Sequence, residues 1–248
     1  MKNILIIGAT SAIAQACARY WLQHSNDCHF VLTGRDQQKL AAIQSDLQIR
    51  GAVAVDCLPF DLADESGRAS LLERVEQLMP QLDRVLVAPG SLPDQQRCQT
   101  DESYAAQAFQ LNANAIVLLL ERLAGKLEQQ RSGKLIVISS VAGDRGRMSN
   151  YFYGAAKAAV TTFCSGLMMR LQKAEVSVSI VKPGFVRTPM TADLELPEKL
   201  VATPEQVARV IVDGAEKCRS VIYAPGFWLL IMTIIKLIPN FVFRRLSL

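Results

Sequence analysis

Short, continuously apolar runs of strand length recur along this chain, and segments with helical periodicity separate them. The runs lie at residues 3–7, 29–32, 52–55, 85–87, 135–138, 176–181 and 221–223. Strands that are apolar along their whole length are typical of a parallel sheet covered by helices on both faces. We therefore predict an α/β fold in which helices flank a seven-stranded, doubly wound parallel sheet.

The size and composition of the chain suit one domain of this kind. Its 248 residues are 50% hydrophobic, which is enough for one large core. We expect residues 1–225 to form that domain and residues 226–248 to form a hydrophobic tail. The net charge is only +4, and basic residues do not cluster before Arg244 and Arg245, so the sequence does not indicate nucleic-acid binding.

Cysteine usage and the N-terminus bear on the compartment. The six cysteines are scattered and lack the spacing of a metal site, which indicates free thiols in a reducing environment and no metal centre. The first apolar run is too short for the core of a signal peptide. We therefore expect a cytoplasmic protein.

The turn after the first run is a candidate ligand site, because α/β sheets bind ligands at the carboxyl ends of their strands. It reads Gly8-Ala9-Thr10-Ser11-Ala12-Ile13-Ala14 and leads into a helical segment. The backbone N–H groups of such a turn and of the helix N-terminus can bind the pyrophosphate of a dinucleotide. Because the turn has one glycine only, an ordinary strand-to-helix turn is an equally good interpretation.

Charged residues after the second and third runs extend this candidate site. An arginine at the end of the second strand can bind the 2′-phosphate of NADP, whereas an acidic residue there binds the 2′-hydroxyl of NAD. Arg35 favours NADP(H), and the neighbouring Asp36 keeps NAD(H) possible. Asp61 follows the third strand, where it contacts an adenine edge or caps the next helix. The turn Ala88-Pro89-Gly90 follows the fourth strand and would approach a ribose.

Ser140, Tyr153 and Lys157 are the candidate catalytic residues. Ser140 follows the fifth strand, and Tyr153 and Lys157, four residues apart, share one face of a helix. A phenol has a reference pKa of about 10, and a cation beside it favours the phenolate. This combination is suited to acid/base catalysis, although the Tyr–Lys spacing alone would be a coincidence on a solvated helix.

A helical stretch with two asparagines and the loop after the sixth strand are further candidate parts of the site. Asn112 and Asn114 lie in an apolar helical stretch, residues 102–127, where a buried amide must be hydrogen-bonded or functional and surface exposure is the simpler alternative for either one. Residues 182–189 form an extended loop after the sixth strand, and residues 190–202, with few helix signals, could form a short lid. Thr203-Pro204-Glu205-Gln206 then predicts a helix start with a capping box.

In this order the motifs resemble those of the short-chain dehydrogenase/reductase family, a Rossmann-type family, over nearly the whole chain to about Tyr223. The resemblance implies that Tyr153 is the proton donor or acceptor, that Lys157 lowers its pKa and holds the nicotinamide ribose, and that Ser140 binds the carbonyl oxygen. It further implies that Asn112, and not Asn114, kinks its helix and positions a relay water. The cofactor residues that it implies are Gly8, Ser11, Ile13, Arg35, Asp61, Ala88, Gly90, Tyr153, Lys157, Pro183, Gly184, Val186 and Thr188.

The chain departs from the family pattern in two places. The glycine motif keeps Gly8 but has Ala12 and Ala14 in place of its other glycines, and an asparagine that braces the sheet is replaced in the turn Ala88-Pro89-Gly90. The family implies an oxidoreductase that uses NADP(H) on a ketone or secondary alcohol, and a homodimer or homotetramer formed through the helices of Asn112 and Tyr153. The alternative is a non-catalytic nucleotide-binding regulator or a membrane-associated assembly protein on the same fold.

The C-terminal tail carries the most hydrophobic run, residues 227–238, which is too short to span a bilayer. Thr233, Lys236, Asn240 and Arg244 would form a narrow polar stripe on an otherwise apolar helix, as in helices that lie in a membrane interface. Burial against the protein itself or against a second subunit is an equal alternative. Together with residues 8–14 and 141–147, the hydrophobic tail makes the chain similar to a bacterial branch related to reductases of polyprenyl-phosphate-linked 2-keto sugars. This resemblance implies a lipid-linked substrate at the inner face of the membrane.

Overall fold

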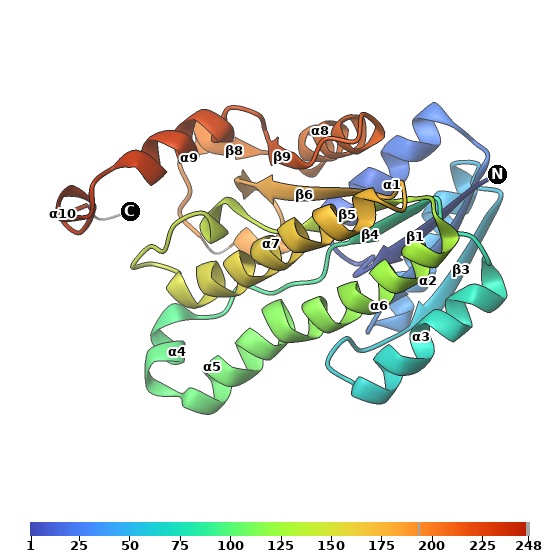
Figure 1. The fold of residues 1–248 in the computed structure, drawn as a ribbon, viewed down its shortest axis with the longest axis horizontal. Helices are drawn as coiled ribbons and strands as arrows, with labels where there is room; N and C mark the ends of the chain where they lie inside the picture. The colour runs from blue at the N-terminus through green and yellow to red at the C-terminus, as the bar shows by residue number, and fades with distance from the viewer. Residues whose placement is uncertain (193, 247–248) are drawn as a thin grey trace.

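The computed structural model describes residues 1–192 and 194–246, so one residue of the predicted lid and the last two of the tail lie outside the described residues. Seven parallel strands form one sheet, in the order β3-β2-β1-β4-β5-β6-β9 (Figure 1). Their bounds are β1 Lys2–Ile7, β2 Cys28–Gly34, β3 Ala54–Pro59, β4 Arg84–Val87, β5 Lys134–Ile138, β6 Ser177–Pro183 and β9 Val221–Ala224. This confirms the predicted doubly wound α/β fold, and the strand order reverses between β1 and β4.

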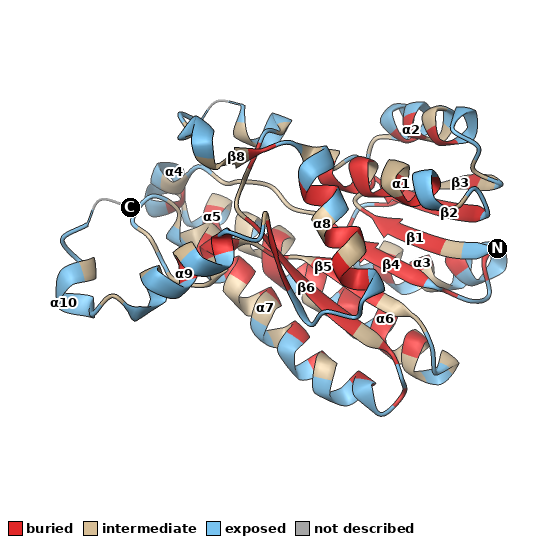
Figure 2. Cartoon of the chain, turned by 90° about the horizontal axis from the view of Figure 1, so that it is seen from above, coloured by how far each residue is buried: buried red, intermediate tan, exposed pale blue. Residues whose placement is uncertain are grey.

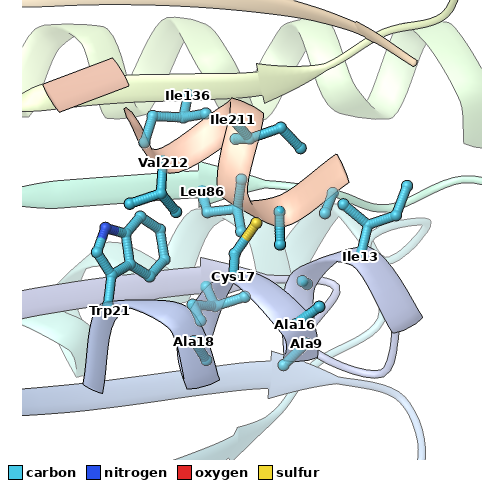
Figure 3. Close-up of a cluster of buried hydrophobic side chains, with 14 of the residues drawn as sticks. Ala9, Ile13, Ala16, Cys17, Ala18, Trp21, Leu86, Ile136, Ile211 and Val212 are labelled. Atoms are coloured by element: carbon cyan, nitrogen blue, oxygen red, sulfur yellow. The ribbon is translucent and has the colours of Figure 1, made fainter. Parts of the chain in front are cut away.

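Helices cover both faces of the sheet. Residues of α1 (Ala12–His24), α2 (Gln37–Ile49) and α8 (Pro204–Glu216) join one core cluster, and residues of α3 (Glu65–Leu78), α6 (Ala115–Gln130) and α7 (Tyr151–Gln172) join the other. Figure 3 shows the first cluster, where Cys17 of α1 and Ile211 of α8 lie beside Leu86 of the sheet. In Figure 2 the buried residues concentrate on the strands and on the helix faces that pack against them. Burial on both faces explains why the central strands are continuously apolar.

One predicted strand was misplaced. The third strand was expected at residues 52–55, but β3 begins at Ala54 and continues to Pro59. β3 is an edge strand of the sheet, and its burial alternates more than that of β2 or β4. Polar Asp56 and half-buried Cys57 therefore belong to the strand, although they interrupt the apolar run on which the prediction rested.

The long helical stretch expected at residues 102–127 contains an irregularity. It consists of α5 (Glu102–Phe109), a π-helical turn (Gln110–Asn114) and α6, and it follows the short helix α4 (Gln95–Thr100). A single π-turn inside an α-helix is rare and frequent at functional sites. The turn contains Asn112, which is almost completely buried, whereas Asn114 is exposed and bonds to Gln110.

The segment after β6 crosses the carboxyl end of the sheet. β7 (Phe185–Val186) pairs in parallel with β8 (Val201–Ala202), and 3₁₀ turns occupy Pro189–Thr191 and Glu198–Leu200. α8 then begins at the predicted capping box, in which Thr203 and Gln206 bond each other's backbone N–H groups. The predicted helix start is therefore confirmed.

The tail is not one continuous helix. α9 (Trp228–Leu237) and α10 (Asn240–Phe243) are separated at Ile238 and Pro239, so the predicted polar stripe does not run along a single helix face. Trp228 and Met232 are buried in a small cluster with Val141 and Tyr223, whereas most of the other apolar tail side chains are exposed (Figure 2). None of the helices in the described part of the chain is long and apolar enough to cross a membrane.

Arg145 fastens the tail to the body of the protein. Its guanidinium donates hydrogen bonds to the Ile235 carbonyl, to the Ile238 carbonyl at 2.7 Å and to Asn240 Oδ1 at 3.0 Å. It also lies 3.7 Å from the ring centroid of Phe243. The inner side of the tail thus packs on its own chain, and the outer side does not.

Candidate active site

A cavity of about 370 Å³ lies at the carboxyl ends of the strands, where the strand order reverses. Fourteen of the fifteen site residues expected from the sequence line it. They are Gly8, Ser11, Ile13, Arg35, Asp61, Ala88, Gly90, Ser140, Tyr153, Lys157, Pro183, Gly184, Val186 and Thr188. The fifteenth, Asn112, lies directly behind the cavity wall.

The turn after β1 is shaped for an anion. Gly8 has a φ of +77°, and a Cβ there would lie 2.8 Å from the backbone nitrogen of Pro89, so no other residue fits. Side chains cap the N-termini of α2, α3 and α8, but Ser11 makes no side-chain cap at α1. The first N–H groups of α1 are therefore left for a ligand such as a pyrophosphate, with Ser11 and Ile13 on the cavity wall.

The ends of β2 and β3 bear on two alternatives that the sequence left open: whether Arg35 or Asp36 faces the cofactor, and whether Asp61 caps a helix or faces the cavity. Asp36 caps α2 by accepting the Lys39 N–H at 3.0 Å, and this backbone hydrogen bond holds the pKa of its carboxyl below the usual value. Exposed Arg35, in contrast, lines the cavity. Asp61 accepts the Ala63 N–H at 2.9 Å, while Asp64 caps α3, so the interpretation of Asp61 as the helix cap is wrong and its place is on the cavity wall.

The three candidate catalytic residues come from β5 and α7. Tyr153 and Lys157 lie on one face of α7, with Lys157 Nζ 5.7 Å from the centroid of the Tyr153 ring. Lys157 is 2% exposed and donates a hydrogen bond to the Ile138 carbonyl at 3.2 Å. Ser140, just after β5, accepts the Ala142 N–H at 3.1 Å through its hydroxyl.

Burial dominates the protonation of this group. Burial raises the pKa of the Tyr153 phenol to about 12, and the Ser140 hydroxyl acts in the opposite direction. Burial lowers the pKa of the Lys157 ammonium to about 8. The resemblance implied that Lys157 lowers the Tyr153 pKa; in the protein alone, burial of the phenol is the larger influence and raises that pKa, and the effect of Lys157 stays a prediction.

Asn112 connects the π-turn to the turn after β4. Its Oδ1 accepts the Ser91 N–H at 2.9 Å, and its Nδ2 donates to the Ala108 carbonyl at 2.9 Å. A Cβ on Gly90 would lie 3.3 Å from Asn112 Oδ1 and 3.4 Å from Lys157 Nζ. The side chains of Asn112 and Lys157 thus both lie next to Gly90, and Asn112 links the π-turn to this part of the cavity wall.

The sequence did not reveal a buried ionic network beside the site. Asp144, four residues after Ser140, pairs with Lys182 of β6 and accepts a hydrogen bond of 2.6 Å from the Tyr223 hydroxyl of β9. The network holds the loop after Ser140 against two strands. A lysine inside the apolar run of β6 was the available signal, because a buried ammonium requires a partner.

Two other polar residues of the cavity also escaped the sequence analysis. Arg147 and Asn150 lie in the loop between Ser140 and Tyr153 and line the cavity. Arg147 Nε and Asn150 Oδ1 are both buried, and neither has a hydrogen-bond partner among the described residues.

Comparison with known proteins assigns the chain to a family. Residues 2–199 match the model of the short chain dehydrogenase family. An uncharacterized oxidoreductase of Mycobacterium tuberculosis is 33% identical over 243 residues, which cover 98% of this chain and 96% of that protein. An uncharacterized oxidoreductase of Streptomyces coelicolor is 32% identical over 246 residues, which cover 99% of this chain and 96% of the other.

Solved structures share the fold at lower sequence identity. A short-chain dehydrogenase from Sphingobium yanoikuyae in complex with NADPH has a TM-score of 0.83 and 23% identity, covering 97% of both chains. The bulky-bulky ketone specific alcohol dehydrogenase from Comamonas testosteroni has a TM-score of 0.80 and 22% identity, covering 97% of this chain and 96% of that one. The fold, the family model and the relatives agree, and the chain belongs to the short-chain dehydrogenase family.

Proposed function

We propose that the protein is an NADP(H)-dependent oxidoreductase that interconverts a ketone and a secondary alcohol. The observation that carries the proposal is the convergence of Ser140, Tyr153 and Lys157 on one cavity at the reversal point of the sheet. When bound, the reduced nicotinamide supplies the hydride that reaches the carbonyl carbon. The two electrons of the C=O π bond pass to oxygen, which takes its proton from the Tyr153 hydroxyl.

Each of the three side chains has a role suited to its position. Tyr153 is protonated at neutral pH because its pKa is high, so it is ready to act as the acid of the reducing direction. Ser140 hydrogen-bonds the carbonyl oxygen and polarises it. Lys157 holds the nicotinamide ribose and, when charged, stabilises the phenolate that Tyr153 becomes.

The cofactor proposal rests on the residues at the ends of β1 and β2. The uncapped N-terminus of α1 and the close approach at Gly8 fit a pyrophosphate. Arg35 on the cavity wall suits a 2′-phosphate, and the carboxylate of Asp36 is engaged by α2, so NADP(H) is favoured over NAD(H). The NADPH complex of the Sphingobium relative is consistent with this choice.

The exposed apolar surfaces of the tail and of α6 and α7 support proposals about the substrate and about the oligomer. The exposed apolar side chains of α9 and α10, with basic Lys236, Arg244 and Arg245 beside them, favour a hydrophobic or lipid-linked carbonyl substrate delivered from the inner face of a membrane, which the tail would contact peripherally. A homodimer or homotetramer would form through the outer faces of α6 and α7, where Leu118 and Met169 are exposed.

The test is the variant Tyr153→Phe, with Tyr151→Phe as the matched control. Tyr151 is on the same helix and exposed, and it has no lysine four residues later. We expect Tyr153→Phe to lower kcat at least about 100-fold with NADPH affinity nearly unchanged, since one proton-transfer residue typically contributes that much or more. Tyr151→Phe should retain wild-type turnover. Unchanged kcat in Tyr153→Phe would refute the mechanism.

Isothermal titration with NADPH and NADH tests the cofactor and the alternative function. Tighter binding of NADPH, lost in Arg35→Ala, supports the assigned 2′-phosphate site. The alanines at Ala12 and Ala14 favour one second candidate, a regulator without turnover, since alanine allows less close an approach than glycine. Failure of the protein to bind either nucleotide would favour that candidate.

A further inference from the structure

Arg147 is a guanidinium without an adequate acceptor, facing the active-site cavity. It lines the cavity together with Asn150 and Tyr153. Its Nε is buried and has no partner among the described residues, and the hydrogen bond described for its side chain runs from Nη2 to the thioether of Met232, at 3.3 Å. Sulfur of this kind is a weak acceptor, and a guanidinium has five N–H donors.

The charge of Arg147 is also poorly balanced. Asp144 is the acidic group that acts on it, but one oxygen of Asp144 pairs with Lys182 and the other accepts from Tyr223. Burial lowers the pKa of the Arg147 guanidinium, yet an arginine stays protonated at neutral pH. Arg147 as a whole is half-buried, but its Nε–H is fully buried. Burying a donor of a cation without an acceptor is costly, so a residue placed in this way calls for a ligand.

A neighbouring arginine provides an internal comparison. Arg145, two residues earlier, uses its guanidinium on the carbonyls of Ile235 and Ile238 and on the Asn240 side chain. Arg145 therefore already holds the tail through oxygen acceptors, so this role does not account for Arg147. Among the described residues of the tail, the hydrogen-bond partner of Arg147 is Met232, and its unpartnered Nε remains buried beside the cavity.

We infer that Arg147 binds an anionic oxygen group, a carboxylate or a phosphate, carried by the same molecule as the reacting carbonyl. The planar guanidinium matches both groups, and the burial of its Nε strengthens such an interaction, because charge-assisted hydrogen bonds are stronger away from water. The unpartnered amide oxygen of Asn150 accepts a hydrogen bond from a hydroxyl of that substrate. The inference rests on the proposed function and narrows it to acidic, hydroxylated ketones.

A matched pair of ketones tests the inference in the full chain with NADPH. Dihydroxyacetone and dihydroxyacetone phosphate carry the same carbonyl and differ in the anion. We expect kcat/KM to be higher for the phosphate, and Arg147→Gln to lower it about 10- to 100-fold for the phosphate while dihydroxyacetone changes less than about threefold, since hydrogen bonds to charged groups are worth about 1.5–3 kcal/mol. Arg147→Lys should recover part of the loss.

Arg122→Gln is the matched control, because Arg122 is exposed on α6 and is not among the residues of the cavity wall. It should behave as the wild type with both ketones. Equal losses on both ketones in Arg147→Gln would assign Arg147 a structural role and overturn the inference. A wild-type enzyme that prefers the neutral ketone would overturn it as well. An alkyl phosphodiester of dihydroxyacetone, assayed beside the phosphate, distinguishes two sources of the anion. A larger loss of kcat/KM in Arg147→Gln for the phosphodiester indicates a lipid-borne anion, and a larger loss for the phosphate indicates a free one.

Anion binding without turnover separates this inference from the proposed function. With NADPH bound, inorganic phosphate should raise the Tm of the wild type and of Tyr153→Phe, relative to chloride at equal ionic strength, but not that of Arg147→Gln. Phosphate stabilisation that depends on Arg147 in a protein without ketone turnover would keep the anion site and refute the proposed reaction. If the protein turns over ketones, but neither phosphate stabilisation nor the preference for the phosphorylated ketone depends on Arg147, the proposed reaction is kept and the anion site is refuted.

Discussion

Lys157 illustrates at the scale of a single residue how stability and activity oppose each other at this site. Its ammonium is buried, and burial lowers its pKa from the reference 10.5 to about 8. Because the unfolded chain binds the proton more tightly than the folded one, the charge destabilises the fold. That penalty is full below pH 8 and disappears as the pH rises to about 10.5. At neutral pH it is of the order of 3 kcal/mol.

We predict that Lys157→Met stabilises the cofactor-free protein at pH 7, by up to about 3 kcal/mol, and abolishes turnover. The stability difference from the wild type should shrink between pH 8 and pH 10.5, where the wild-type lysine becomes neutral. Urea unfolding of the variant and of the wild type at pH 7 and at pH 10 measures the stability difference and how it changes with pH. Lys173→Met, at the exposed C-terminal end of the same helix, should change little at either pH. A Lys157→Met protein less stable than the wild type at pH 7 would contradict the prediction.

The residues that could be located from the sequence are those that a local pattern marks. Tyr153 and Lys157 are four apart on a helix, and Ser140 directly follows a strand, so spacing alone brought them to one sheet edge. Arg147 has no such pattern. Its side chain contacts Met232, 85 residues later, and this contact exists only because the tail packs back on the loop after Ser140.

At the scale of secondary-structure elements, Glu216 joins the end of α8 to two strands. Its carboxylate binds Arg84 Nε of β4 at 2.5 Å and Lys134 Nζ of β5 at 2.9 Å. Burial acts to raise the pKa of the Glu216 carboxyl, but the hydrogen bonds from these two cations outweigh it and hold the pKa at about 2. The carboxylate therefore stabilises the fold above its unfolded pKa of 4.5, and this stability is lost as the pH falls toward 2.

We predict that Glu216→Gln lowers the free energy of unfolding at pH 7 by about 1–2 kcal/mol, a value reduced because the side chain is about a third exposed and screened by solvent. The difference from the wild type should narrow when unfolding is measured at pH 3. Glu205→Gln, an exposed glutamate in the first turn of the same helix, serves as the control. A deficit in Glu216→Gln that is as large at pH 2 as at pH 7 would rule out the ionic explanation.

Elements with uniform burial could be located from the sequence, whereas elements with uneven burial could not be located correctly. The central strands were placed within a residue or two because both of their faces are covered. The edge strand β3 was misplaced because its burial is not uniform, and the π-turn was not predicted because it depends on the hydrogen-bond partners of the Asn112 amide. The break between α9 and α10 lies at Ile238 and Pro239, because a proline cannot continue a helix.

At the scale of the whole molecule, the tail packs its inner side against the loop that follows Ser140 and leaves its outer side uncovered. Trp228 and Met232 form a third, separate core cluster that joins α9 to Tyr223 of β9 and to Val141. The ring of Trp228 lies edge-on to Phe185, with 5.2 Å between centroids. The docking of the tail and the shape of the cavity are therefore coupled through the segment that follows β6.

We predict that Trp228→Ala weakens tail docking by up to about 3–5 kcal/mol, the usual cost of removing a buried aromatic side chain. Proteolysis within α9 and hydrogen exchange of its amides should accelerate. Leu230→Ala, which removes a side chain that is 67% exposed, should leave both rates unchanged. Equal protection of α9 in Trp228→Ala and wild type would show that the indole does not hold the tail.

The contact between the tail and the turn after β6 also constrains the order in which these positions can evolve. A Cβ added to Gly184 would lie 1.9 Å from Nε1 of the Trp228 indole, a distance that no small adjustment relieves. A lineage that loses the tryptophan first is free to try side chains at position 184, whereas a lineage that replaces the glycine first must displace the tail. The two positions, 44 residues apart in the sequence, therefore form an epistatic pair, because a side chain at position 184 is tolerated without a clash only after the tryptophan has been replaced.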